Sequence, residues 1–305
     1  MSSMFAEQWQ GVIPAITTPF AADGSVDHSF LAGHARRLVA SGCRGIVALG
    51  SLGEGATLTF DEKVEILRTL VAAVGERVPV IAGISALSTD EAVALARAAT
   101  GAGCSGLMVL PPYVYQGDWA EMRDHVSAVI SATPLSCMLY NNPIAYGTDF
   151  LPEQVRLLCA QHANLHALKE SSGDVRRITA LKALLGDRIR LLVGLDDAVV
   201  EGVAAGARGW VAGLVNALPD ESVLLFEHAV AGRAAEVRTL YDWFLPLLRM
   251  DTVPKFVQLI KLVQQEVGLG DERVRAPRRV IEGAEREMAM AVISRALASK
   301  PVSAS

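Results

Sequence analysis

A lysine at the end of an apolar run is the first residue of this sequence that could carry chemistry. Residues 165–169 read Leu-His-Ala-Leu-Lys and Glu-Ser-Ser-Gly follows, so a strand gives way to a loop at Lys169. If the run is a buried strand, the ammonium form of Lys169 loses hydration there, and its neutral amine is a candidate nucleophile. A solvated lysine, or one paired with Glu170, is the more common outcome, so the remaining residues must decide.

Phenols and a glycine-rich turn could complete such a site. Tyr140 ends another apolar run, and the turn Gly50-Ser51-Leu52-Gly53 follows a third. A phenol can relay protons beside an imine, and the turn offers backbone N–H groups to a substrate carboxylate. Each feature has a structural alternative: the turn can simply join a strand to a helix, and other tyrosines can be packing aromatics with exposed hydroxyls, namely Tyr113, Tyr115 and Tyr146.

Eight alternations of a short apolar run with a longer helical pattern position these residues. The unbroken apolar runs are typical of strands buried on both faces, and the helical patterns begin with caps such as Thr59 with Glu62. Eight such units in about 220 residues predict an α/β protein with a closed parallel (β/α)8 TIM barrel. The expected strands are residues 12–16, 45–49, 79–83, 106–110, 135–140, 165–169, 189–193 and 208–211.

The alternation stops after Pro219, where helical patterns continue without strands. We therefore divide the chain into a TIM barrel, residues 8–219, and a C-terminal helical extension, residues 220–300. The amphipathic helices of the extension need a surface to cover, so we expect them to pack on their own barrel or on a neighbouring subunit.

In such barrels the active site lies at the carboxyl ends of the strands. This rule places Tyr140 and Lys169 at the ends of adjacent strands and selects the loops that follow the other strands. Acidic residues in these loops are expected to cap the following helices: Glu54, Asp196 and Asp197.

Composition and charge exclude several classes of protein. Hydrophobic residues make up 51% of the chain, which is enough to bury a large core without disulfides. A net charge of -5 and scattered arginines argue against a nucleic-acid partner. We expect neither a signal peptide nor a membrane span, and place the protein in the cytoplasm. The cysteines and histidines show no metal-binding spacing, so we expect no metal site.

Taken in order, the motifs resemble those of the dihydrodipicolinate synthase and N-acetylneuraminate lyase family, the DapA-like family. The resemblance spans essentially the whole chain and rests on four segments: Gly50-Ser51-Leu52-Gly53-Glu54 for the family's G-[ST]-T-G-E turn, Tyr140-Asn141-Asn142-Pro143 for Y-N-x-P, Leu168-Lys169-Glu170 for the imine lysine, and Gly194-Leu195-Asp196 for G-x-D. It implies a class I aldolase-type lyase that forms a covalent lysine Schiff base and needs no cofactor. It also implies a homotetramer built as a dimer of dimers.

The resemblance assigns roles residue by residue. Lys169 is similar to the Schiff-base lysine, Tyr140 to the phenol that shuttles protons, and Ser51 to the hydroxyl of the relay and carboxylate grip. Tyr113 is similar to a tyrosine contributed across a subunit contact. The expected substrate-binding residues are Gly50, Leu52, Gly53, Asn142, Gly194, Leu195 and Gly213.

Two departures from the family pattern narrow the substrate. Leu52 replaces the second hydroxyl of the turn. Ala145 stands where lysine-pathway synthases carry an arginine that grips the second substrate's carboxylate, so that pathway is not expected. Residues 141–150 and 251–268 resemble the branch that degrades hydroxyproline, whose deaminase converts 1-pyrroline-4-hydroxy-2-carboxylate into 2-oxoglutarate semialdehyde and ammonia.

Alternatives remain open within and outside this chemistry. The substrate is a small 2-keto acid or a cyclic imine acid. A 2-keto-3-deoxy sugar acid dehydratase or a pyruvate-dependent aldolase would need polar partners for the substrate tail near Asn142, Tyr146 or Asn216. A barrel that binds a keto acid without catalysis is the third reading. The joint retention of Lys169, Tyr140, Ser51 and Tyr113 argues against it.

Overall fold

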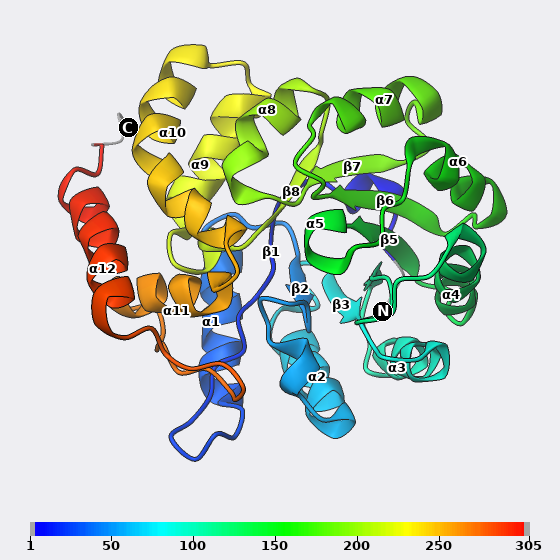
Figure 1. The fold of residues 1–305 in the computed structure, drawn as a ribbon, viewed down its shortest axis with the longest axis horizontal. Helices are drawn as coiled ribbons and strands as arrows, with labels where there is room; N and C mark the ends of the chain where they lie inside the picture. The colour runs from blue at the N-terminus through cyan, green and yellow to red at the C-terminus, as the bar shows by residue number, and fades with distance from the viewer. Residues whose placement is uncertain (1–3, 302–305) are drawn as a thin grey trace.

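Eight parallel strands close into a barrel (Figure 1). A computed structural model describes residues 4–301 of the chain. The sheet runs in the order β1-β8-β7-β6-β5-β4-β3-β2, and a parallel bridge between Ala15 and Val47 joins its two edges. The predicted (β/α)8 fold is therefore confirmed. The strands are β1 Gly11–Pro14, β2 Ile46–Ala48, β3 Val80–Ile84, β4 Gly106–Val109, β5 Ser136–Asn141, β6 Leu165–Glu170, β7 Arg190–Val193 and β8 Gly209–Ala212.

Helices surround the barrel, and several begin at the predicted caps. Thr59 and Glu62 form a capping box at the start of α2, because each side chain accepts from the other residue's backbone N–H. The helices are α1 His28–Ala40, α2 Phe60–Val74, α3 Thr89–Gly101, α4 Trp119–Ser131, α5 Pro143–Tyr146, α6 Pro152–Gln161, α7 Arg176–Leu185, α8 Val199–Ala204, α9 Pro219–Val230, α10 Ala234–Leu248, α11 Phe256–Glu266 and α12 Gly283–Ala298. Short 3-10 turns lie at η1 Ala6–Gln8, η2 Gly55–Thr57, η3 Asp196–Ala198, η4 Leu214–Asn216 and η5 Arg249–Thr252.

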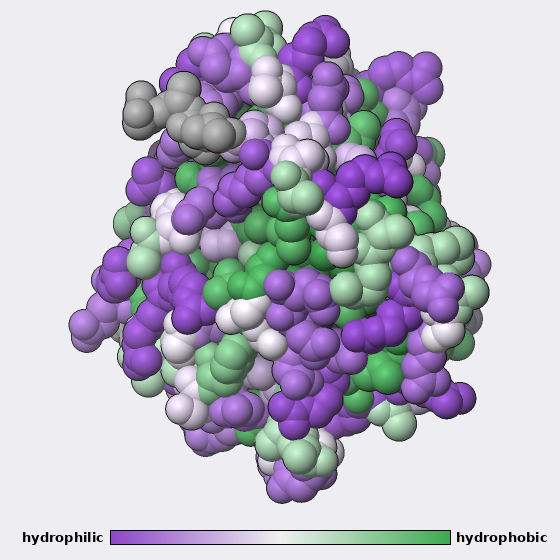
Figure 2. Space-filling model, turned by 90° about the vertical axis from the view of Figure 1, so that its left-hand side faces the viewer, coloured by the Kyte–Doolittle hydropathy of each residue, from purple (hydrophilic) through white to green (hydrophobic). Residues whose placement is uncertain are grey.

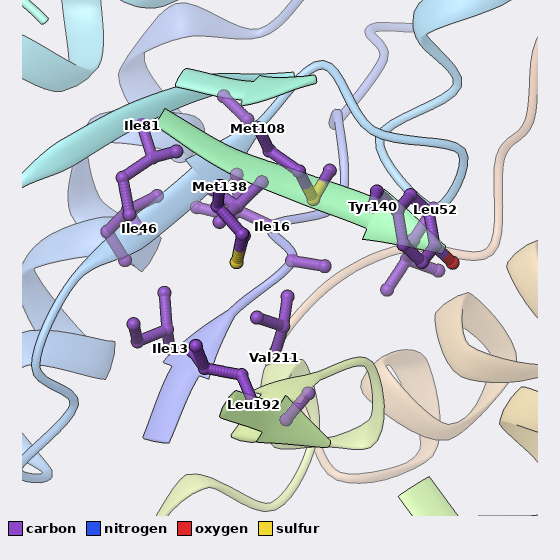
Figure 3. Close-up of a cluster of buried hydrophobic side chains, with 14 of the residues drawn as sticks. Ile13, Ile16, Ile46, Leu52, Ile81, Met108, Met138, Tyr140, Leu192 and Val211 are labelled. Carbon is purple, nitrogen blue, oxygen red and sulfur yellow. The ribbon is translucent and has the colours of Figure 1, made fainter. Parts of the chain in front are cut away.

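Side chains from all around the sheet fill the barrel interior. Figure 3 shows this core, with Tyr140 near the end of the β5 arrow. Because the interior is packed, a substrate can be held only above the strand ends, where the β-α loops begin. The fully buried aliphatic residues of this layer include Ile13, Ile46, Ile81, Met138 and Leu192.

The helices after β8 do two different things. The helix α9 packs against β1 and α8 and completes the ring around the barrel, whereas α10, α11 and α12 lie beside it (Figure 1). Trp243 Nε1 donates to the carbonyl of Ala296 at 2.8 Å and ties α10 to α12. The boundary expected at residues 219 and 220 stays a prediction. In Figure 2 the side that carries α12 is largely hydrophilic, with hydrophobic side chains reaching the surface near the middle.

None of the helices within residues 4–301 combines the length and apolar character needed to span a bilayer.

Candidate active site

A cavity of about 460 Å³ opens at the carboxyl ends of the strands. Most of the predicted site residues line it, whereas Gly53 and Tyr113 lie just outside its lining. The structure therefore brings together residues from the ends of five strands: Gly50, Ser51, Leu52, Tyr140, Asn142, Lys169, Gly194, Leu195 and Gly213.

The amine of Lys169 lies in this cavity and forms no ion pair with a described residue. Lys169 pairs with Tyr140 in the β5–β6 register, and its Nζ lies 4.1 Å from the centre of the Tyr140 ring. The residue is 6% exposed, and within residues 4–301 its Nζ makes no ion pair or hydrogen bond. A Cβ at Gly194 would come within 2.6 Å of Lys169 Cε, so glycine leaves room for the lysine. The amine is thus free to meet an incoming carbon.

Glu170 does not neutralise Lys169, although it is adjacent in sequence. Its carboxylate accepts from the Ser172 N–H at 2.7 Å and from Asn141 Nδ2 at 3.1 Å. Burial raises the pKa of Glu170, and these hydrogen bonds oppose the rise. The pairing considered from sequence is therefore absent.

Hydroxyls gather on one side of Lys169. Ser51 Oγ lies 3.2 Å from the Tyr113 hydroxyl and also bonds the Tyr146 hydroxyl. Tyr146 packs edge-on against Tyr113 and against Tyr140, with 5.7 Å between ring centroids in each pair. We call Ser51, Tyr113, Tyr140 and Tyr146 the phenol wall. Ser51, Tyr113 and Tyr146 are joined by hydrogen bonds, and Tyr140 meets them through its ring. The subunit-crossing role expected for Tyr113 stays a prediction.

Tyr146 belongs to the phenol wall, whereas from sequence it is expected only as a packing aromatic or as a partner for a sugar-acid tail. Asn142 caps the short helix α5 by accepting from the Ala145 N–H at 3.0 Å, and Pro143 occupies its first position. This turn brings Tyr146 back over the cavity, and burial raises the pKa of its phenol well above the ordinary value. The Asn142 amide also donates to the Tyr140 hydroxyl at 3.0 Å. The Asn142-Pro143 pair, which is typical of a helix start, is the sequence feature that could have indicated this position of Tyr146.

The glycine-rich turn is shaped by backbone constraints on both sides. Leu49 and Glu54 adopt left-handed φ values of 65° and 54°, and a Cβ at Gly53 would lie 2.9 Å from the Ile16 carbonyl. Glu54 does not cap a helix as predicted. It is fully buried and binds Lys261 Nζ at 2.7 Å, because α11 of the extension brings a cation behind the turn.

Carboxyl groups gather on the other side of Lys169. The prediction that Asp196 caps a helix is wrong, since its fully buried carboxylate accepts from Trp210 Nε1 at 2.9 Å, Gly213 N at 3.0 Å and Leu214 N at 2.7 Å. Burial raises the pKa of Asp196 to about 6, and these N–H donors oppose the rise. Asp251 of η5 also lies against Gly213, since a Cβ there would collide with its Oδ1. We call Asp196, Gly213 and Asp251 the carboxyl wall.

Asp197 also fails to cap the following helix. Its carboxylate lies 3.9 Å from Arg249 Nε, and α8 begins after Ala198 without a side-chain cap. The extension therefore reaches the loop after β7 as well as the end of β8.

The rest of the cavity is largely apolar. Among the described residues that line it, Lys169 has the only cationic side chain, and Ala145 lines it in the place where an arginine was considered. The segment after η5 adds lining residues that the sequence reasoning did not select, namely Thr252, Val253, Pro254 and Phe256. Asn216 is fully buried in bonds to Ala15 and Gly213 and does not line the cavity. Within residues 4–301 no group of His, Cys, Asp and Glu is arranged to hold a metal ion.

Comparisons with known proteins agree with this geometry. Residues 8–296 match the model of the dihydrodipicolinate synthetase family. The chain is 32% identical over 289 residues to 4-hydroxy-tetrahydrodipicolinate synthase of Geotalea daltonii, covering 93% of this chain and 98% of the relative.

Solved structures give the same result. Dihydrodipicolinate synthase DapA-2 from Bacillus anthracis superposes with a TM-score of 0.90 at 28% identity, covering 96% of this chain and 99% of the other. YagE from E. coli K12, solved in complex with pyruvate, superposes with a TM-score of 0.88 at 26% identity, covering 95% and 99%. The chain therefore belongs to the dihydrodipicolinate synthetase family and is a lyase of the class I aldolase, Schiff-base type.

Proposed function

We propose that the chain is the dehydrative deaminase of 1-pyrroline-4-hydroxy-2-carboxylate, with Lys169 as its Schiff-base residue. The observation that carries this proposal is the combination of one buried amine with an otherwise uncharged or acidic cavity. A substrate with a second carboxylate would need a cation to replace its hydration, and Ala145 leaves none at that place. A compact ring with one carboxylate does not need it.

The apolar lining also favours a compact substrate over a sugar acid. A polyhydroxylated tail would lose hydrogen bonds to water against Ile144, Val253 and Phe256. Of the partners expected for such a tail, Asn216 is occupied by backbone carbonyls and Asn142 is engaged with Tyr140. Tyr146 lines the cavity, but its hydroxyl bonds Ser51. The pyrroline ring has one hydroxyl to satisfy.

The reaction begins at the amine. Lys169 Nζ attacks C2 of the cyclic imine. The C2–N1 bond of the ring then breaks as Tyr140 gives its phenol proton to N1, which leaves an open-chain iminium on the lysine and a phenolate on Tyr140. The iminium withdraws electrons from C3, so Tyr140 removes a C3 proton and the C4 hydroxyl leaves as water. Tautomerisation moves the double bond to the C5 amine, and hydrolysis of the two imines releases ammonia, 2-oxoglutarate semialdehyde and free Lys169. One water is consumed overall.

The phenol wall supports the proton transfers. Tyr140 lies against the amine and accepts a hydrogen bond from Asn142, which leaves its own proton free for exchange. The hydroxyl of Ser51 and the backbone of the glycine turn face the substrate carboxylate, since Gly50 and Ser51 line the cavity beside Leu52. The protein's contribution is to hold these groups at the reacting carbons.

Borohydride trapping tests the Schiff base. Wild-type protein incubated with pyruvate and borohydride should gain a covalent adduct by mass spectrometry, and Lys169→Ala should gain none. An adduct that survives the substitution would place the amine elsewhere. The matched control is Lys255→Ala, an exposed lysine of the segment next to the cavity.

Ammonia release tests the substrate. Wild-type protein should release ammonia from 1-pyrroline-4-hydroxy-2-carboxylate, with a higher kcat/KM than for dehydration or cleavage of 2-keto-3-deoxy sugar acids. Turnover of the sugar acids alone would replace the deaminase by the dehydratase or aldolase alternative. Trapping without turnover of either would leave a keto-acid-binding barrel.

We also infer that copies of the chain assemble, with a homotetramer as the expected state, and that the enzyme works in the cytoplasm on hydroxyproline breakdown. Leu87 and Val114 support assembly, because they are 69% and 89% exposed on neighbouring loops joined by the Tyr113 N–H to Ala86 carbonyl bond. Val114 also holds a φ of 73°, which is strained for a β-branched residue. Light scattering should give the mass of four chains; the mass of one chain would contradict assembly.

A further inference from the structure

Asp251 places a carboxyl group in the cavity from outside the barrel. It lies in η5, between α10 and α11, and lines the same cavity as Lys169. Its carboxyl stands directly over Gly213 at the end of β8, where any Cβ would collide with it. A glycine at position 213 therefore allows the extension to bring an acid to the strand ends.

The surroundings of Asp251 favour its neutral form. The N–H groups nearby are used by Asp196, which accepts from Trp210, Gly213 and Leu214. Within residues 4–301 no N–H group or cation bonds the Asp251 carboxyl, whose residue is only partly exposed. Burial, and next the charge of Asp196, raise the pKa of Asp251 well above its ordinary value, while Lys169 opposes the shift. The nearby N–H donors stabilise the carboxylate of Asp196, so the proton resides on Asp251.

The two walls then offer opposite proton chemistry to a substrate on Lys169. The phenol wall stands beside Tyr140 on β5, and the carboxyl wall stands over β7 and β8, with β6 and Lys169 between them. Loss of a hydroxyl from carbon is slow unless the oxygen is protonated as it departs. A neutral acid opposite the phenols is suited to that task.

We propose that Asp251 is the catalytic acid that protonates the C4 hydroxyl as it leaves the lysine-bound substrate. The step rests on the proposed function and deepens it. Tyr140 takes the C3 proton, the C3–H electron pair becomes the C3–C4 double bond, and the C4–O bond breaks. The oxygen leaves as water with the proton of Asp251. The Asp251 carboxylate recovers a proton from C5 when the tautomerisation makes the imine there.

Asp251→Asn tests this role because the amide keeps the size of the side chain and lacks the acid. Ammonia release from 1-pyrroline-4-hydroxy-2-carboxylate should fall about 10²- to 10⁴-fold, the usual contribution of a positioned acid. Borohydride trapping of pyruvate on Lys169 should stay within about twofold of wild type, which also shows that the variant is folded. The matched control, Asp187→Asn, changes an exposed acid that pairs with Lys182 outside the cavity and should leave both measurements unchanged.

A substrate whose leaving group needs no proton distinguishes a catalytic acid from a positioning residue. Chloride departs without a proton, so Asp251→Asn should release it from the 4-chloro analogue of the substrate at close to the wild-type rate. Equal losses with the hydroxyl and chloro compounds would overturn the proposal, and so would loss of pyruvate trapping, which would mean that Asp251 acts through Lys169.

Asp251→Asn also shows whether a negative result concerns the acid role of Asp251 or the identity of the substrate. If wild-type protein releases no ammonia, the proposed substrate is wrong, and dehydration of a 2-keto-3-deoxy sugar acid, which also loses a C4 hydroxyl, replaces the assay. A comparable loss in Asp251→Asn there would support the acid. An unchanged rate there, or wild-type protein that dehydrates neither compound, would overturn it.

Discussion

The phenol wall and the carboxyl wall flank the same lysine but are built from different parts of the chain. The barrel alone supplies the phenol wall, with Ser51 after β2, Tyr140 on β5 and Tyr146 in α5. The carboxyl wall needs the extension, since Asp251 reaches Gly213 only when the segment after α10 lies over β8. The residues of the first wall thus come from strand ends and the loops after them, whereas the second wall needs a residue of the extension.

The groups behind the two walls also differ in charge. The turn of the phenol wall is held by the ion pair of Glu54 and Lys261, whose side chains are 0% and 2% exposed. Behind the carboxyl wall the contacts are neutral: Asn216 Nδ2 donates to the Ala15 and Gly213 carbonyls at 2.8 Å, and His34 Nε2 lies 3.2 Å from Asn216 Oδ1. The ion pair behind the phenol wall should therefore be sensitive to the loss of one partner. The contacts of His34 and Asn216 behind the carboxyl wall should be sensitive to pH.

Lys261→Met should give the largest change in stability and should act on the phenol wall. Without Lys261 the buried Glu54 carboxylate keeps only its weaker contacts, Arg278 Nη1 at 3.7 Å and the Arg275 N–H at 3.0 Å, so the free energy of unfolding should fall by about 3 kcal/mol, the low end for a broken buried pair. Urea unfolding at neutral pH measures it. Lys255→Met is the control, because its ion pair with Glu285 is solvent-exposed, and it should cost about 0–1 kcal/mol.

A double substitution shows whether the loss belongs to the pair. Adding Glu54→Gln to Lys261→Met removes the unpaired carboxylate and should recover part of the stability. Additive losses from the two substitutions would mean that Glu54 and Lys261 contribute independently. The statement that their ion pair holds the turn of the phenol wall would then be wrong.

Tyr140→Phe should separate proton transfer from binding. The ring still packs against Lys169, but its hydroxyl is lost, so kcat should fall about 10²- to 10³-fold with a much smaller change in KM. Steady-state ammonia release measures both constants. Tyr115→Phe is the control, since that hydroxyl bonds Glu121 outside the cavity. A rise in KM with kcat unchanged would make Tyr140 a binding residue only.

The difference between the walls also explains what the sequence could predict. Lys169 and Tyr140 end apolar runs, so the barrel rule places them together without further information. The local sequence favours a cap for Asp196, because an acid before a helix usually caps it. Its true partners, Trp210 and the Gly213 N–H, come from the next strand, so only the tertiary fold reveals them.

Residues of the extension were harder still to place. No periodicity relates Asp251 to Gly213, because their contact depends on how the segment after α10 crosses the barrel end. The helical pattern that contains Lys261 does not predict its ion pair with the buried Glu54. The strands and the motif residues on them were predictable from local pattern, and the groups that complete the site from a distance were not.

His34 gives the smallest effect and tests the neutral support of the carboxyl wall. Burial, with Arg37 adding, lowers the pKa of His34 from 6.5 to about 4, while the bond to Asn216 opposes the shift. Between these values the unfolded chain binds a proton that the folded chain does not, so stability falls as pH drops from 6.5 toward 4. The loss should be about 2 kcal/mol at pH 5, from about 1.4 kcal/mol per pH unit.

Thermal unfolding of His34→Gln and His34→Leu at pH 7 and pH 5 measures this contribution. Both variants lack the titrating ring, so both should lose less stability between the two pH values than wild type does. Only glutamine keeps an N–H for Asn216 Oδ1, so His34→Leu should be less stable than His34→Gln at pH 7. Parallel pH profiles for wild type and both variants would mean that the folded protein protonates His34, and that the two walls do not differ in the charge of their supports.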